Sequence, residues 1–312
     1  MKHLRDRLAV ALTRFGLLVI PIFPRPFIVA SARVLGTLAY ILALRARRIG
    51  FENLDVVYGD SLTDTEKKRI LRSSFRTFAL ALIDIFWFTR FPHDRLKRYV
   101  HFDENSIRKL SQTPLICITG HIGGWETLGQ AVPSAGFPVH SVAAPLSNPG
   151  VDQLFIPSRE LSGQTILPKK GALPKLLRIL KQGGRLSLLL DQNTRPSEGG
   201  LFTPFLGLPA PVSSSAALLA LRTGCSMLFG FAIPDQNGTY HVMAPRWISA
   251  EEVQSIAGAH VDPIGELTHE IVKTYEEVIR TYPGHWIWMY KRWKFIAPGH
   301  DRAVYPSYAK HP

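Results

Sequence analysis

The chain has 312 residues, of which 46% are hydrophobic and 20% charged, so it can build one large α/β domain or two smaller ones. Its 37 lysines and arginines exceed its 24 acidic residues, and the net charge of +13 favours a nucleic acid, an anionic membrane surface or an acidic protein as partner. Zinc-finger spacing, a basic heptad region and a glycine-aromatic RNA-binding signature are all missing from the sequence, and we therefore expect no nucleic-acid partner.

Residues 1–48 are both basic and apolar, with eight arginines and a single acidic residue, Asp6. Their uncharged runs stop short of the roughly 18–20 residues of a transmembrane helix, and Pro21, Pro24 and Pro26 interrupt them. The pattern favours an interfacial pair of helices that anchors the protein, with arginines at anionic lipid headgroups. Two alternatives remain, namely ordinary core helices with a basic face and a single tilted span over residues 15–44.

Residues 49–100 are predicted to be helical. Thr63 and Glu66 form a helix start signal, with Thr63 as N-cap and Glu66 at the third helical position. The helix that follows carries a stripe of aromatic residues that is typical of a core but would also suit a slot for an acyl chain. The stripe consists of Phe75, Phe78, Phe86, Trp87 and Phe88.

From residue 114 onward, short apolar segments alternate with helical ones. This alternation predicts an α/β/α sandwich with a largely parallel mixed sheet. The expected strands are residues 115–119, 139–143, 164–167, 185–190, 227–233 and 240–244, the last two paired around the turn Asp235 to Gly238. The expected helices are residues 126–132, 152–161, 173–181, 213–223 and 263–282. We expect residues 194–211 to form a loop, residues 49–296 to form the main domain and residues 297–312 to be a loosely ordered tail.

The central feature is the segment from Thr119 to Thr127, because it places His121 at a turn between a strand and a helix. Glu126 follows in the first helical turn, where we expect it to reach back and orient His121 as a general base. The glycines Gly123 and Gly124 let the backbone approach a ligand, and their N–H groups are candidate donors to an oxyanion. Functional groups of such a sheet gather at the carboxyl ends of its strands.

Other catalytic arrangements do not fit this segment. No Gly-x-Ser-x-Gly elbow supplies a nucleophile, and the His-x4-Glu spacing differs from the His-Glu-x-x-His of zinc hydrolases. His101, His140 and His241 have no spacing that would complete a metal site, so we predict no metal. A base without a protein nucleophile is suited to activating a substrate hydroxyl, which then attacks an acyl donor directly.

The segment Gly120 to Glu126 resembles the His-x4-Asp/Glu motif of the lysophospholipid acyltransferase superfamily. More narrowly, the chain resembles the late acyltransferases of lipid A biosynthesis, the lauroyl and myristoyl transferases, in five blocks that occur in the same order. Besides the motif, these blocks are Arg48 with Asn53-Leu54; Asn148-Pro149 with Arg159 and Gly163; Leu188 to Gln192 with residues 202–210; and the aromatic-basic run from His285 to Lys294. The resemblance implies a glycerol-phosphate acyltransferase-like fold.

The family transfers a fatty acyl chain, usually from acyl carrier protein, to a hydroxyl of a lipid A precursor at the cytoplasmic face of the bacterial inner membrane. The resemblance therefore implies acyl carrier protein, anionic membrane lipids and a glycolipid acceptor as partners, and no cofactor beyond the acyl thioester. An acidic carrier protein suits a chain with a charge of +13. The expected substrate-binding residues, besides the two glycines, are Arg159, Asp191, Gln192, Lys291 and Arg292.

One departure leaves the acceptor open. Many relatives carry Asp-Gln-Asp where this chain has Asp191-Gln192-Asn193. If the third position touches the acceptor, the acceptor differs, and an enzyme of the same branch that uses acyl-CoA and a phosphatidylinositol mannoside is the first alternative. The second alternative is a lipid-binding protein without catalytic activity on the same scaffold.

Overall fold

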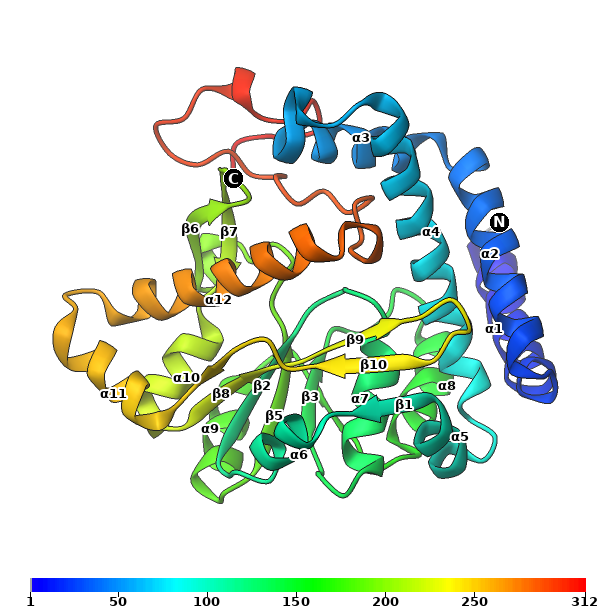
Figure 1. Ribbon diagram of the computed structural model, residues 1–312, viewed down its shortest axis with the longest axis horizontal. Helices are drawn as coiled ribbons and strands as arrows, with labels where there is room; N and C mark the ends of the chain where they lie inside the picture. The colour runs from blue at the N-terminus through cyan, green and yellow to red at the C-terminus, as the bar shows by residue number, and fades with distance from the viewer. Residues whose placement is uncertain (1) are drawn as a thin grey trace.

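The computed structural model describes residues 2–312, and most of the chain is in regular secondary structure (Figure 1). The helices are α1 (Lys2–Val19), α2 (Arg25–Leu42), α3 (Leu44–Tyr58), α4 (Asp64–Trp87), α5 (Pro92–Tyr99), α6 (Glu104–Leu110), α7 (Trp125–Ser134), α8 (Pro149–Glu160), α9 (Ala172–Lys181), α10 (Ser215–Thr223), α11 (Ala250–Ala259) and α12 (Pro263–Thr281). The strands are β1 (Val100–Phe102), β2 (Leu115–Thr119), β3 (His140–Ala143), β4 (Thr165–Pro168), β5 (Arg185–Leu189), β6 (Gly200–Phe205), β7 (Leu208–Ser213), β8 (Ser226–Phe229), β9 (Phe231–Pro234), β10 (Tyr240–Met243) and β11 (Trp247–Ile248).

The main sheet has six strands in the order β11-β8-β2-β5-β3-β4, and every neighbouring pair is parallel except the β11–β8 pair at one edge. Strand β2 lies at the centre of this sheet between β5 and β8, which explains why it is apolar on both faces. The sheet confirms the predicted fold class. It also confirms the expected strand at residues 115–119.

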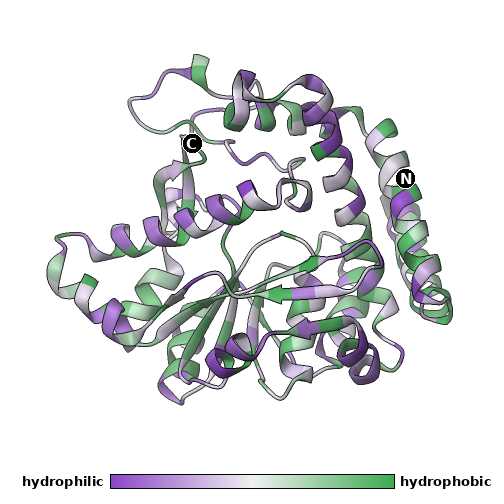
Figure 2. Ribbon diagram, viewed as in Figure 1, coloured by the Kyte–Doolittle hydropathy of each residue, from purple (hydrophilic) through white to green (hydrophobic). Residues whose placement is uncertain are grey.

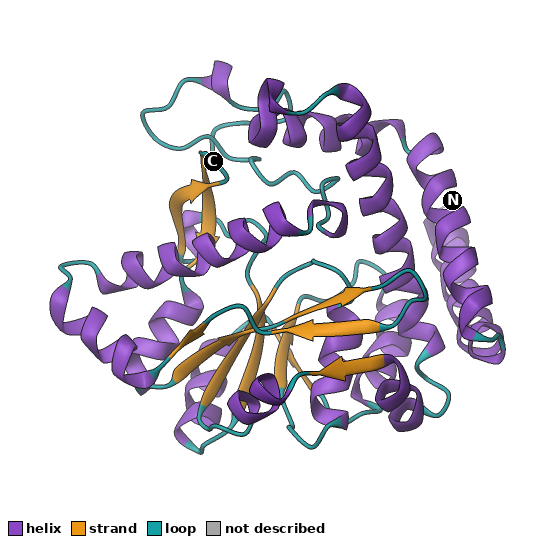
Figure 3. Ribbon diagram, viewed as in Figure 1, coloured by secondary structure: helices purple, strands orange, loops and turns teal. Residues whose placement is uncertain are grey.

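Helices cover both faces of this sheet (Figure 3). On one face, Leu128 and Val132 of α7 pack with Leu115 of β2. On the other face, Leu176 and Leu180 of α9 pack with residues of β2 and β5, and α10 and α12 extend this core. Because α7 begins directly after the turn that follows β2, its N-terminus lies at the carboxyl edge of the central strand.

The expected strand over residues 227–233 divides at Gly230 into β8 and β9, which belong to different sheets. The N–H of Gly230 donates to the carbonyl of Ile118 at 2.9 Å, so the chain leaves the main sheet beside the end of β2. Strand β9 then pairs with β10 as the predicted hairpin, and β10 pairs with β1. The three-stranded sheet covers α7 from the side.

The N-terminal helices α1 and α2 lie along one edge of the molecule, away from the main six-stranded sheet (Figure 1). The next long helix, α4, begins with the predicted capping box, in which Thr63 and Glu66 each accept a hydrogen bond from the other residue's backbone N–H. Among the described helices, α2 alone has the length and apolar composition that crossing a bilayer requires. Helices α1 and α2 both show extensive hydrophobic stretches in Figure 2.

Two segments are more ordered than the sequence indicates. The expected loop at residues 194–211 contains the antiparallel hairpin β6–β7. The tail after residue 296 packs back onto the domain, where Tyr305 is buried and the hydroxyl of Tyr308 donates to the side chain of Asn53. Asn53 in turn donates to the carbonyls of Trp288 and Tyr290.

Candidate functional site

The site is built on the turn between β2 and α7. Gly123 in this turn has φ of +62°, and a Cβ there would lie 2.1 Å from the carbonyl oxygen of Ala232. A Cβ on Gly124 would lie 2.2 Å from the ring of Tyr240. The two glycines are therefore needed because the turn runs against the β9–β10 hairpin, and this contact fixes where the backbone of His121 lies.

His121 is paired with Asp191, which follows β5. Nδ1–H of His121 donates to Oδ1 of Asp191 at 2.9 Å, and the backbone N–H of His121 donates to Oδ2 at 3.0 Å. The indole Nε1–H of Trp286 also donates to Oδ2, at 3.0 Å. Asp191 is 1% exposed, whereas the side chain of His121 is 22% exposed, so the carboxylate is enclosed and the imidazole faces the opening.

The charges of this pair stabilise each other. Burial by itself would lower the pKa of His121, but the charge and hydrogen bond of Asp191, with a smaller contribution from Glu126, raise that pKa above 6.5. Burial by itself would raise the pKa of Asp191, but His121 and the hydrogen bond from Trp286 hold it below 3.8. Asp191 therefore stays ionised and keeps the Nδ1–H tautomer, which leaves Nε2 of His121 as the basic atom.

The expected contact from Glu126 to His121 is not formed. Glu126 instead accepts two hydrogen bonds from Arg159 of α8, from Nε at 2.8 Å and from Nη2 at 2.5 Å. This ion pair joins α7 to α8, and both side chains are mostly buried. The reason is geometric: at the first turn of α7, Glu126 faces α8, while Asp191 arrives beside His121 from the neighbouring strand. Asp191, and not Glu126, is thus the carboxylate that is hydrogen-bonded to His121.

Of the other residues that were expected to bind the substrate, one lies at the site with its side chain available, and three do not offer a free group. Gln192 lies at the site, with its Nε2 3.2 Å from Nε2 of His121. The N–H groups of Gly123 and Gly124 already donate to the carbonyls of His285 and Ala232, so they are not free for an oxyanion. Asp191, enclosed as it is, supports His121 and has no surface for a substrate.

The run from His285 to Arg292 supports the site through hydrogen bonds. Trp286 holds Asp191, and the hydroxyl of Tyr290 accepts from the N–H of Asn193 at 3.1 Å. Arg292 is completely buried, so it does not reach a sugar phosphate as expected; its Nη1 donates to Oδ1 of Asn193 at 2.7 Å. Lys291 is partly exposed and accepts through its carbonyl from Nδ2 of Asn193.

Sequence reasoning did not find the roles of Trp286 and Tyr275. The hydroxyl of Tyr275 donates to the carbonyl of Thr119 at 2.5 Å and accepts from the N–H of Leu190 at 3.3 Å, so it joins the ends of β2 and β5. An aromatic residue with a polar tip in a buried helix face is the only signal that the sequence offers for such a role.

An apolar cavity lies along the α7 face of β2 and reaches Thr119, two residues before His121, without including His121, Asp191 or Gln192 in its wall. It has a volume of about 40 Å³, and its wall includes Cys117, Thr119, Leu128 and Ser187. Leu110 of α6 closes it near the opposite edge of the sheet. The aromatic stripe of α4 does not contribute to its wall, and Phe75, Trp87 and Phe88 are core residues.

Within residues 2–312 there is no group of three or more His, Cys, Asp and Glu side chains that could hold a metal ion. The site thus consists of an imidazole with one basic nitrogen toward the opening, a buried carboxylate behind it, an amide beside it and an apolar cavity next to it. Such a site can take a proton from a hydroxyl group, as the histidine of a catalytic triad does.

The family described as bacterial lipid A biosynthesis acyltransferase matches residues 1–295 of the chain. The chain belongs to this family. The resemblance found in the sequence is thereby confirmed, and the protein is an acyltransferase of a family of membrane-associated bacterial enzymes in lipid A biosynthesis. No curated protein matches this acyltransferase significantly.

Proposed function

We propose that this acyltransferase moves a fatty acyl chain from an acyl thioester, carried by acyl carrier protein, to a hydroxyl group of a lipid A precursor. The observation that carries the proposal is the 2.9 Å hydrogen bond between His121 and Asp191, which leaves Nε2 of His121, next to the amide of Gln192, as the basic atom. The role that the sequence assigned to Glu126 passes to Asp191. His121 remains the base whichever of these two carboxylates is its partner.

The reaction needs no covalent intermediate on the protein. Nε2 of His121 takes the proton of the acceptor hydroxyl as its oxygen attacks the thioester carbonyl carbon, and Asp191 stabilises the imidazolium that forms. The tetrahedral intermediate then collapses, and its carbon–sulfur bond breaks. The leaving thiolate takes the proton from Nε2, so the products are an ester and a free thiol.

Gln192 and Arg159 are the candidate substrate contacts. The amide of Gln192 lies against Nε2 of His121, at the place where the hydroxyl must bind, so it is suited to donate to the oxyanion or to the acceptor. Arg159 uses Nε and Nη2 to hold Glu126, and its Nη1 makes no hydrogen bond to any residue within 2–312. That nitrogen is a candidate donor to a phosphate group of the acceptor.

The apolar cavity is the proposed site of the acyl chain. Its volume of about 40 Å³ has room for only a few water molecules, so the side chains of its wall must move apart when the chain binds. It begins at Thr119, two residues before His121, and follows β2, which is five residues or about 16 Å long. An acyl chain in this cavity would bring its thioester carbon to the carboxyl end of the strand. The cavity wall is apolar except for a few hydroxyl, thiol and backbone groups, as a hydrocarbon chain requires.

The charge and the family support the proposed partners and location. A net charge of +13 suits both an acidic carrier protein and an anionic bilayer. We extend the proposal to the cytoplasmic face of the inner membrane, where the carrier protein is available. Asn193 binds Arg292 and Lys291, so its difference from the relatives gives no reason to choose another acceptor.

The direct test is acyl transfer with purified protein, acyl carrier protein thioester and a lipid A precursor, followed by mass spectrometry of the lipid. We expect the mass of one acyl chain to be added by the wild type and a loss of at least about 10²-fold in rate for His121→Ala. Transfer by His121→Ala at the wild-type rate would refute the mechanism. Transfer only from acyl-CoA, or only to another glycolipid, would refute the proposed substrates.

A further inference from the structure

We propose that α1 and α2 lie flat in the surface of one leaflet of an anionic bilayer, and that neither helix crosses the membrane. This inference concerns how the acyltransferase is attached and goes beyond the reaction proposed above. It assigns α2, which is apolar and long enough for a span, to an interfacial position. The argument rests on the two faces of α2, on its attachment to the domain and on the positions of the arginines.

Both helices expose a narrow stripe of large apolar side chains at spacings of three or four residues, which places each stripe on one face of its helix. Thirteen of the twenty large hydrophobic side chains that are exposed within residues 2–312 lie between residues 4 and 44. On α1 and the turn after it these are Leu4, Leu8, Leu12, Phe15, Leu18 and Ile22. On α2 they are Phe27, Val34, Leu35, Leu38, Ile41 and Leu42, and Leu44 follows at the start of α3.

The opposite face of α2 is part of the protein core. Ile28, Ala32 and Tyr40 are buried on that face. At Gly36 the helix backbones are so close that a Cβ would lie 2.5 Å from Cα of Arg76 in α4. Helix α2 therefore has two apolar faces, one packed on α4 and one exposed, while its exposed Arg33 donates to the carbonyl of Gln236. If α2 crossed the bilayer, this packed face would have to separate from α4.

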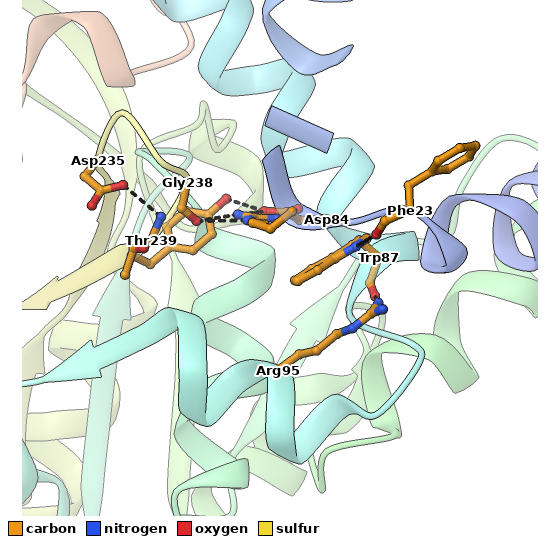
Figure 4. A network of polar contacts seen from close by, with 9 residues as sticks. Phe23, Asp84, Trp87, Arg95, Asp235, Gly238 and Thr239 are labelled. Atoms are coloured by element: carbon orange, nitrogen blue, oxygen red, sulfur yellow. Dashed lines mark hydrogen bonds and ion pairs between the residues drawn. The ribbon is translucent and has the colours of Figure 1, made fainter. Parts of the chain in front are cut away.

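An ion pair at the start of α2 fixes the helix to the domain (Figure 4). Arg25 binds both oxygens of Asp84 in α4, at 2.5 and 3.0 Å, and its Nε donates to the carbonyl of Gly238 at 3.1 Å. The hydroxyl of Tyr240 also donates to Asp84, at 2.6 Å. Arg25 and Asp84 are 3% and 0% exposed, and separating such a pair would leave a charge buried without a partner.

The turn between α1 and α2 is held in the same way. Nε1–H of Trp87 donates to the carbonyl of Phe23 at 2.9 Å (Figure 4). Arg95, which also donates to the carbonyl of Trp87, donates to the carbonyl of Pro21 at 2.7 Å. At the other end of α1, Nδ2 of Asn148 donates to the carbonyl of Asp6 at 3.0 Å. Both helices are thus attached to the domain along their length, and their apolar stripes remain outside.

The charges identify the surface as an anionic bilayer. On a helical projection of α1, the exposed Arg5 falls at one border of the apolar stripe and the exposed Arg7 and Arg14 at the other. This places guanidinium groups at the level of the headgroups when the stripe is in the acyl region. Because Asn148 caps α8, the helix of Arg159, a bilayer under α1 lies next to the helix that reaches the site.

The test measures depth with spin labels on the full-length protein bound to vesicles of phosphatidylethanolamine and phosphatidylglycerol. Labels are placed on the exposed positions of Phe27→Cys, Val34→Cys and Leu42→Cys, and on Val261→Cys as a control at the far edge of the molecule. We expect the three α2 labels at similar depths of about 5–10 Å and the control in water. A depth that passes through the bilayer midplane from the first label to the third would overturn the proposal.

A second measurement tests whether the exposed apolar side chains of α1 and α2 contact lipid. The variant Leu8→Gln/Leu12→Gln/Leu38→Gln changes exposed side chains, and Leu173→Gln/Val261→Gln/Val304→Gln is the matched control. We expect the first variant to bind vesicles at least about 10²-fold more weakly than the control, and to transfer acyl chains at the wild-type rate in detergent micelles. Unchanged vesicle binding, or an altered oligomeric state in its place, would refute the lipid assignment. Normal vesicle binding by a wild type that transfers no acyl chain in detergent would count against the proposed reaction alone.

Discussion

Nη1 of the buried Arg292 donates to Oδ1 of Asn193 at 2.7 Å, two residues after the carboxylate that orients His121. Nη1 also donates to the carbonyl of Pro211 at 3.2 Å, but among the described residues Arg292 has no salt-bridge partner, and its Nε and Nη2 make no hydrogen bond. Burial lowers the pKa of this guanidinium to about 10. A charge of this kind depends on every acceptor it has, so we expect Asn193 to have a structural role and not to contact the acceptor lipid.

This relationship predicts opposite effects for two substitutions of Asn193. Asn193→Leu removes an acceptor from a buried cation and should lower the free energy of unfolding by about 1–3 kcal/mol in a urea titration. Asn193→Asp places a carboxylate against Arg292 and should be at least as stable as the wild type, with an unchanged KM for the acceptor. Equal destabilisation by both, or a changed acceptor KM for Asn193→Asp alone, would contradict this role.

The pH dependence of the reaction should follow the pKa of His121, which is raised by its pairing with Asp191. A general base must be neutral, so kcat/KM rises with pH through the pKa of His121, and the raised pKa puts this limb above pH 6.5. Asp191→Asn removes the main cause of the increase and leaves burial, which lowers the pKa. We therefore expect the limb to move to lower pH and kcat to fall by about 10²–10⁴-fold.

Glu126→Gln is the matched comparison for this profile. Glu126 raises the pKa of His121 by its charge alone, without a hydrogen bond, so its removal should shift the limb in the same direction by less. A larger shift for Glu126→Gln than for Asp191→Asn would restore Glu126 as the orienting carboxylate. The measurement is the kcat/KM profile of the three proteins at a saturating concentration of the second substrate.

The stability of the folded protein has a related pH dependence. The raised pKa of His121 means that its contribution is fully present below pH 6.5 and is lost as the pH rises through the folded pKa. The lowered pKa of Asp191 means that its contribution is present above pH 3.8 and is lost as the pH falls through the folded value. Urea titrations across pH should show both losses of folding stability in the wild type. In Asp191→Asn, the part of each loss that comes from the His121–Asp191 pair should be absent.

The strand and helix around His121 could be predicted because their signals are local. Residues 115–119 form an uninterrupted apolar run, and the glycines mark the turn that follows. The partner of His121 could not be chosen this way. Glu126 is five residues away in the sequence and Asp191 seventy. Only the parallel pairing of β2 with β5 shows that Asp191 is the carboxylate that lies next to His121 in space.

The missed hairpin β6–β7 has a similar explanation. Pro204, Pro209 and Pro211 lie within its strands, and proline normally argues against a strand. A two-stranded ribbon can accept them because each strand has one free edge where no N–H is needed. The order of the tail also depends on a distant contact, since Tyr308 binds Asn53 of α3.

The ion pair of Glu126 and Arg159 should behave as one unit. Glu126→Gln leaves the mostly buried Arg159 without its carboxylate, and Arg159→Met leaves Glu126 unpaired, so each single change should reduce kcat/KM. The double variant should lose less than the sum, with a coupling of about 1–3 kcal/mol in the double-mutant cycle. Additive losses would show that the two side chains act separately, for example with Arg159 bound only to substrate.

The apolar cavity should set the length of the acyl chain that is transferred. Cys117 lies in the cavity wall at the middle of β2, and burial raises the pKa of its thiol to about 12, so it is present as a neutral, inert side chain. Cys117→Met adds volume there and should shift the preference in a competition between donors of different acyl length toward the shorter ones. Cys117→Ala is the control and should keep or extend the preferred length. A shortened preference in Cys117→Ala, or none in Cys117→Met when the protein remains folded by circular dichroism, would place the acyl chain elsewhere.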